Sequence, residues 1–148
     1  MSDGPWMIDG PAVIAALREA DARSGGTREA WTAAWAAERA ELDARARAAA
    51  AAAGGLVVER DAFANTWYLL PGERPGTVLV SSHSDCVPGG GWLDGILGVH
   101  AGLGLLAAVA AGDASGEAPE RRTLAVVDWA DEEGTRFGRS LLGSGAAT

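Results

Sequence analysis

The stretch TLAVVDWADEE (123–133) is an almost continuous apolar run that ends in three consecutive acidic residues. Such a run is typical of a strand at the centre of a helix-covered sheet. A second apolar strand, TVLVSS (77–82), lies upstream and is followed directly by His83, Ser84 and Asp85. Because functional groups gather outside the carboxyl ends of strands in open α/β sheets, we expect these two polar ends to converge on one site.

Helical and extended patterns surround the two strands. Residues 9–22 and the alanine-rich stretch 27–53 predict helices, the second ending at Gly54-Gly55. Short β-branched or aromatic segments predict further strands at 56–60 and 65–70, with turns at Pro71-Gly72 and Pro75-Gly76.

The downstream half continues the same alternation. Residues 95–111 predict a buried helix rather than a membrane span, because the segment contains His100 and several glycines. A solvent loop at 112–120 precedes the central strand, and a loop with a helix start follows it. We therefore expect an α/β, three-layer α/β/α fold, with residues 1–54 as a helical lead-in and 55–148 as an α/β core.

Composition excludes several classes of function. The 148-residue chain carries a net charge of −8, and its 12 basic residues are all arginine. Without lysine there is no Schiff-base or P-loop chemistry, and the acidic balance argues against nucleic acid as a partner. The single cysteine, Cys86, and a start without a signal-peptide pattern favour a cytoplasmic protein with no membrane association.

The polar residues after the two strands suit a pair of divalent metal ions. His83 offers an imidazole nitrogen, while Asp94 and Glu133 offer carboxylate oxygens. Asp85 is spaced to accept the other ring N–H of His83, and Glu132 is free to act as general base toward water. Alone, an H-x-D motif, a Glu pair or an Asp-Gly turn is commonly structural, but their combination and order favour a metal site.

Other residues carry weaker signals. Cys86 would need a histidine base to serve as a nucleophile, and His83 is better explained as a ligand. His100, within the apolar helix, is interpreted as structural. Arg136 is equally compatible with binding a substrate carboxylate and with pairing to an acidic neighbour, and the six tryptophans are interpreted as packing residues.

Two longer blocks resemble a known family. SSHSDCVPGGGWLDGILGVHAGLGLL (81–106) and VVDWADEEGTRFGRSLLGSGA (126–146) are similar to the signature blocks of the hydantoinase/carbamoylase family. This family contains N-carbamoyl-L-amino-acid hydrolases and allantoate amidohydrolases, within the dinuclear zinc aminoacylase/carboxypeptidase superfamily. The segment GLVVERDAFANTWYLLPG (55–72) resembles the family's lead-in.

The resemblance implies a role for each candidate residue. His83 and Glu133 would each bind one of two divalent ions (zinc, or manganese, cobalt or nickel), and Asp94 would bridge them. Glu132 would be the catalytic base and Asp85 the residue that orients His83. The family pattern also implies a cis peptide between Asp94 and Gly95.

The implied activity is hydrolysis of non-peptide C–N bonds in small-molecule carbamoyl or ureido substrates. Metallopeptidase or aminoacylase activity is the alternative among enzymes. Full-length relatives are homodimeric and carry further ligands and a lid/dimerisation domain downstream of the matched region. We therefore expect a truncated form of the enzyme, with a non-catalytic fragment or one half of a split enzyme as alternatives.

Overall fold

The computed structural model describes residues 6–51, 54–116 and 120–147. Its elements follow in the order α1 (Gly10–Ser24), α2 (Ala33–Ala50), β1 (Val57–Arg60), β2 (Thr66–Leu70), β3 (Arg74–His83), α3 (Ile96–Ser115), β4 (Arg122–Trp129) and α4 (Leu142–Ala146). The strands form a four-stranded mixed sheet in the order β1-β2-β4-β3. Only the β3–β4 pair is parallel among these, and α3 makes the crossover between its two strands.

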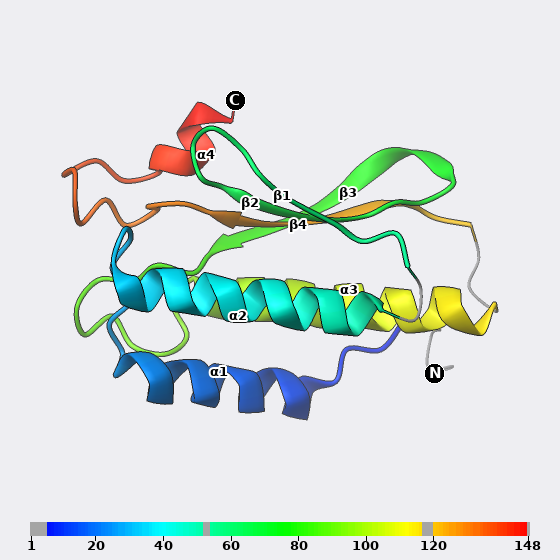
Figure 1. The fold of residues 1–148 in the computed structure, drawn as a ribbon, viewed down its shortest axis with the longest axis horizontal. Coiled ribbons are helices and arrows are strands. Elements are labelled where there is room, and N and C mark those ends of the chain that lie inside the picture. Colours follow the sequence, from blue (N-terminus) through cyan, green and yellow to red (C-terminus); the bar gives the residue numbers. More distant parts are fainter. Residues whose placement is uncertain (1–5, 52–53, 117–119, 148) are drawn as a thin grey trace.

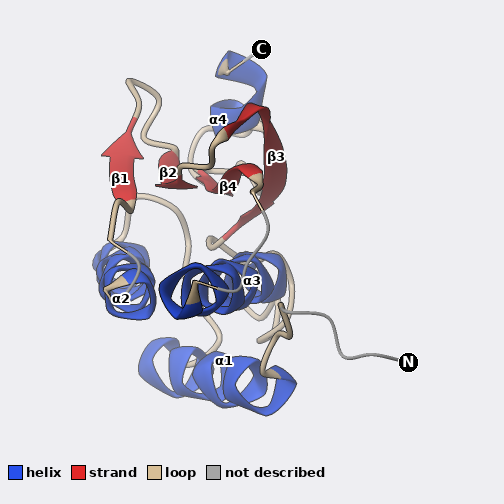
Figure 2. Cartoon of the chain, turned by 90° about the vertical axis from the view of Figure 1, so that its right-hand side faces the viewer, coloured by secondary structure: helices blue, strands red, loops and turns tan. Residues whose placement is uncertain are grey.

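The helices lie mainly on one side of the sheet. Helices α2 and α3 run along one face, and α1 packs behind them as a further layer (Figures 1 and 2). On the opposite side of the sheet, the described residues form the short helix α4. The predicted α/β class is confirmed, and the second helical layer of the expected α/β/α arrangement is represented in this chain by α4.

The core forms where β4 and the helices meet. Strand β4 lies between β2 and β3, as its apolar run predicted, and its residues 124–128 are buried. Helix α3 has the length and mean hydropathy (1.6) of a membrane span, yet half of it is buried against the sheet and the other helices. It is therefore the core helix that the sequence predicted, extended to Ser115.

Helix α2 begins later than predicted, at Ala33 rather than residue 27. Thr32 caps it by accepting the Trp35 N–H at 3.3 Å. Upstream, Arg28 forms a β-bridge with Cys86, so a long-range contact replaces the helical hydrogen bonds of this segment. The predicted end of this helix at residues 52–53, like residues 117–119 of the predicted loop, lies outside the described residues.

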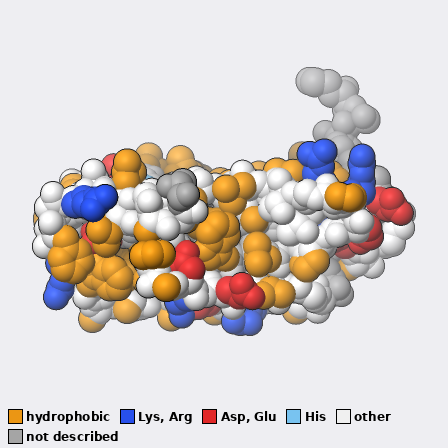
Figure 3. Space-filling model, turned by 90° about the horizontal axis from the view of Figure 1, so that it is seen from above, with side chains coloured by type: hydrophobic (Ala, Val, Ile, Leu, Met, Phe, Trp, Pro, Cys, Tyr) orange, Lys and Arg blue, Asp and Glu red, His pale blue; other side chains and the backbone are white. Residues whose placement is uncertain are grey.

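Strand β3 also departs from the prediction. The expected turn at Pro75-Gly76 is instead an irregularity inside a ten-residue strand, where the register with β4 shifts between Arg74 and Thr77. Strand β3 is an edge of the sheet, and its apolar residues Val78 and Leu79 are 49% and 51% exposed. Figure 3 shows hydrophobic side chains gathered in patches on the face above the sheet.

Candidate metal centre

The parallel pairing of β3 and β4 sets the position of the site. Their register pairs His83 with Trp129, so the two carboxyl ends lie side by side. The loop that follows each strand therefore starts at the same edge of the sheet, as the sequence predicted.

Four side chains from these ends meet there. Ligand atoms of His83, Glu132 and Glu133 lie within 4.8 Å of one another. The Nε2 atom of His83 is 3.5 Å from a Glu132 carboxylate oxygen and 3.9 Å from one of Asp94. The side chain of His83 is only 13% exposed, whereas that of Asp94 is 62% exposed. The group is thus anchored by a nearly buried imidazole and opens to solvent at Asp94.

Asp85 contacts His83 differently from the prediction. Its backbone carbonyl lies 3.0 Å from His83 Nδ1, whereas its carboxylate is 3.7 Å away. Because a carbonyl can only accept, this bond places the proton on Nδ1 and leaves the Nε2 lone pair facing Glu132 and Asp94.

The buried Asp85 carboxylate connects the two loops. It accepts the backbone N–H groups of Glu132 at 3.3 Å and Glu133 at 3.2 Å. Burial raises the pKa of Asp85, and these two backbone hydrogen bonds act against that rise. Asp85 therefore orients the glutamates as well as the histidine.

Gly95 packs directly against the imidazole ring of His83. A Cβ at this position would lie 2.3 Å from His83 Cε1, so only glycine lets the ring pack here. The expected cis peptide is wrong: the peptide bonds of the described residues, including Asp94–Gly95, are trans. The chain instead turns through the positive φ of Gly95 (65°), which glycine adopts without a steric penalty.

These residues fit a divalent cation. One imidazole nitrogen with several carboxylates is a donor set that zinc and related ions accept. Glu133 Oε1 is buried and, within the described part of the chain, has no hydrogen-bond partner. A buried acceptor without a donor is uncommon, and a bound cation would satisfy it.

Supporting residues around the site were not predicted from the sequence. Asn65 is buried, accepts the Ala130 N–H at 3.0 Å and donates to the Gly143 carbonyl at 3.0 Å. Trp35 donates to Ser84, which in turn donates to Asp128 at 2.8 Å. The tryptophans were interpreted as packing residues only, and their i, i+4 spacing was the one available signal.

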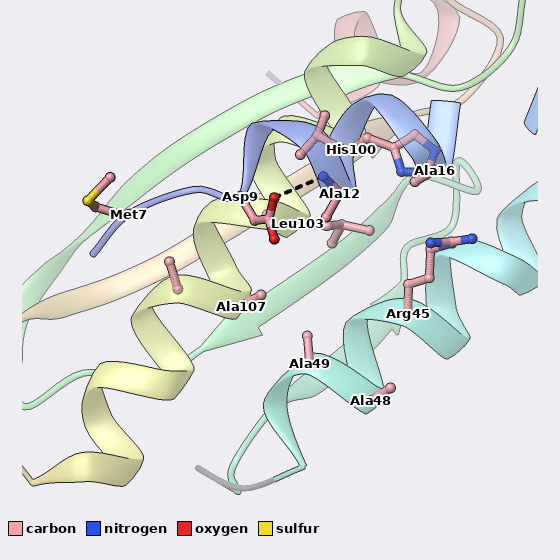
Figure 4. A pocket seen from close by; sticks show the side chains of 13 residues that line it. Met7, Asp9, Ala12, Ala16, Arg45, Ala48, Ala49, His100, Leu103 and Ala107 are labelled. Carbon is pink, nitrogen blue, oxygen red and sulfur yellow. Dashed lines mark hydrogen bonds between the residues drawn. The ribbon is translucent and has the colours of Figure 1, made fainter. Parts of the chain in front are cut away.

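The remaining candidates are not among the side chains that form this group. His100 is 4% exposed, and its Nε2 is 3.7 Å from Glu38, which agrees with the predicted structural role. Figure 4 shows His100 at the wall of a cavity of about 450 Å³ between α1, α2 and α3, lined largely by alanines. Cys86 is a buried free thiol, and the Arg136 guanidinium lies 5.7 Å from the Phe137 ring centre.

Several known proteins are similar to this chain in sequence or in structure. No family model matches the chain. It is 37% identical over 92 residues to an N-carbamoyl-L-amino-acid amidohydrolase of Pseudomonas sp. (strain NS671), covering 61% of this chain and 21% of that protein. It is 39% identical over 95 residues to a ureidoglycolate hydrolase of Arabidopsis thaliana, covering 63% and 19%.

A solved structure matches over nearly the whole chain. A hydantoinase/carbamoylase family amidase from Burkholderia vietnamiensis superposes with a TM-score of 0.83 at 27% identity, covering 99% of this chain and 35% of that one. The chain therefore shares the α/β fold of this amidase. The homologues and structural neighbours of this chain are hydantoinase/carbamoylase family amidases, as the signature blocks predicted. The chain spans about a fifth of the length of this Pseudomonas relative and about a third of the length of this Burkholderia amidase.

Proposed function

We propose that this chain is the metal-binding part of an amidohydrolase that cleaves non-peptide C–N bonds of N-carbamoyl-L-amino acids or ureido compounds such as allantoate. The observation that carries the proposal is the meeting of His83, Glu132 and Glu133 within 4.8 Å at the end of a parallel strand pair. The names of the relatives supply the substrate class. A cytoplasmic location is part of the proposal, supported by the free thiol of the single cysteine.

Each residue of the group has a proposed task. His83, Asp94 and Glu133 would hold the divalent ions. When bound, such ions polarise a carbonyl oxygen and acidify water. Glu132 takes a proton from the attacking water and returns it to the leaving nitrogen as the C–N bond breaks. For a carbamoyl substrate the products are the amino acid, ammonia and carbon dioxide.

The surrounding contacts prepare these groups for their tasks. The bond between the His83 imidazole and the Asp85 carbonyl keeps Nε2 free to bind a cation. The Asp85 carboxylate fixes the backbone of both glutamates, which lets their side chains take different roles at adjacent positions. Glu132 is 28% exposed, so water can reach it.

A second candidate is a piece that needs a partner polypeptide, either as a non-catalytic fragment or as one half of a split enzyme. The donors His83, Asp94 and Glu133, shared between two ions, are fewer than the four that each zinc ion takes. The exposed edge of β3 would accept a further strand. Among enzymes, metallopeptidase or aminoacylase activity is the alternative to carbamoyl or ureido hydrolysis.

Calorimetric titration of the purified chain with Zn²⁺ and Mn²⁺ tests the metal site. We expect His83→Ala and Glu133→Gln to abolish binding, Glu132→Gln to retain it, and the control His100→Ala to bind as the wild type does. If the wild-type chain binds neither ion, or if His83→Ala binds them equally well, the proposed site is wrong.

A substrate panel tests the reaction. The metal-loaded chain is assayed with N-carbamoyl-L-amino acids, allantoate, N-acetyl amino acids and dipeptides. Turnover of the first two supports the proposal, and turnover of the last two alone favours the acylase or peptidase. Activity that arises only when the downstream part of a relative is co-expressed identifies a split enzyme.

A further inference from the structure

Trp31, just before α2, and Trp35, in its first turn, reach the two loops that carry the candidate metal ligands. The indole N–H of Trp31 donates to Asp131 Oδ2 at 2.9 Å, and Asp131 directly precedes Glu132. The indole N–H of Trp35 donates to Ser84 Oγ at 3.1 Å, and Ser84 lies between His83 and Asp85. One short segment therefore contacts both strand ends.

The two indoles form one unit. Their ring centroids are 5.3 Å apart at an interplanar angle of 61°, an edge-to-face contact. Trp35 is 4% exposed, and its bond to Ser84 continues to the buried Asp128, which pairs with Arg39 one turn further along α2 at 3.3 Å. Successive turns of α2 thus contact the end of β3, through Trp35 and Ser84, and the end of β4, through Arg39 and Asp128.

The hydrogen bond between Trp31 and Asp131 joins two residues with unfavourable backbone conformations. Trp31 and Asp131 have φ values of 67° and 54°, in the left-handed region that residues with a Cβ rarely adopt. Such conformations persist only where surrounding contacts enforce them, and they gather at functional sites. Here the two strained residues are hydrogen-bonded to each other across 100 positions of sequence.

The Asp131 carboxylate depends on this bond. Asp131 is fully buried, and its other oxygen, Oδ1, has no hydrogen-bond partner among the described residues. Loss of the indole N–H would leave a buried carboxylate without its donor, a state that drives rearrangement of the loop. That loop holds the backbone of Glu132 and Glu133 against Asp85.

We propose that Trp31 and Trp35 are positioning residues, a tryptophan brace that sets the spacing between the His83–Asp85 loop and the Asp131–Glu133 loop. That the two loops bind metal ions rests on the proposed function. The brace itself is a property of the metal-free chain, so it can be tested separately.

Amide hydrogen exchange of the metal-free protein tests the brace. Trp31→Phe keeps an aromatic ring but removes the N–H donor. We expect the Glu132 and Glu133 amides to exchange at least tenfold faster, while the Val126 amide in β4 reports any global unfolding. Trp6→Phe is the matched control, because the buried Trp6 indole N–H has no partner among the described residues.

Metal titration gives a second readout that a purely structural role would not move. Trp31→Phe and Trp35→Phe should weaken Zn²⁺ binding at least tenfold, while Trp6→Phe leaves the affinity unchanged. If Trp31→Phe does not fold, Asp131→Ala removes the same bond from its other end and should accelerate the same two amides.

Exchange rates for Glu132 and Glu133 that are equal in the Trp31→Phe and Trp6→Phe proteins would overturn the brace. Faster exchange in a chain that binds no metal would support the brace and refute the proposed function instead. The two failures are therefore distinguishable.

Discussion

Replacing Gly95 with alanine should damage the candidate metal centre through the His83 ring. The added Cβ would lie 2.3 Å from Cε1 and 2.4 Å from Nδ1 of His83. Ordinary contact between such atoms begins near 3.5 Å, so the ring must move by about 1 Å. The ring cannot absorb this movement in place, because Nε2 already lies 3.5 Å from Glu132 and Nδ1 is held by the Asp85 carbonyl.

Metal–ligand distances in well-formed sites stay within about 0.2 Å of their typical values. We therefore expect Gly95→Ala to weaken Zn²⁺ binding by about 10- to 100-fold, the range found when the support of a metal-bound histidine is lost. Calorimetric titration of the two proteins measures this directly. Urea unfolding of the metal-free proteins measures the accompanying loss of stability.

Gly89→Ala is the matched control for backbone strain. Gly89 also has a positive φ (72°), but a Cβ there would meet no atom within 4 Å. Both variants should lose stability because alanine is strained at positive φ, and Gly95→Ala should lose more because its Cβ also meets the His83 ring. Only Gly95→Ala should lose metal affinity. Equal Zn²⁺ affinities for the two variants would show that close packing against Gly95 does not position the His83 ring.

Three further predictions concern the rest of the chain. Burial raises the pKa of Asp128 from 3.8 to about 6, so the folded state binds this proton more tightly than the unfolded state does. The free energy of unfolding should therefore fall as the pH rises from about 4 to 6. Urea unfolding across that range should show a smaller fall for Asp128→Asn. Asn65→Ala leaves the Ala130 N–H and a second backbone group unpaired and should cost about 3 kcal/mol in urea unfolding, and a loss below about 1 kcal/mol would contradict this. The exposed edge of β3 predicts that the chain self-associates as its concentration rises, and that Leu79→Lys reduces this in light scattering. Unchanged scattering in the variant would show that this edge does not drive association.

Much of the fold could be predicted from local pattern. The apolar run at 123–130 has few alternatives to a central strand, and β4 occupies that position. The start of α2 could not be predicted, because no residue between Thr27 and Thr32 forbids a helix. The bridge between Arg28 and Cys86 decides that segment, and a contact across 58 positions leaves no local trace.

In the candidate site, too, the local sequence pattern predicted some features, and long-range contacts decided the others. The types and spacing of His83, Asp94, Glu132 and Glu133 identified the groups that the structure brings together. Their supports were missed or misassigned, because they involve backbone atoms and distant side chains. The Asp85 carboxylate faces backbone N–H groups, which every residue but proline carries, so nothing in the sequence singles out this pairing.

The pairing of His83 with Trp129 makes the centre sensitive to a single-residue slip. Side chains alternate between the faces of a strand, so sliding β3 by one position would turn the imidazole toward the opposite surface while most ladder hydrogen bonds re-formed. Deleting one residue from 77–82 would therefore leave a sheet of similar secondary-structure content with its ligands divided between two sides. Circular dichroism would hardly distinguish that protein from the original, whereas a metal titration would separate them at once.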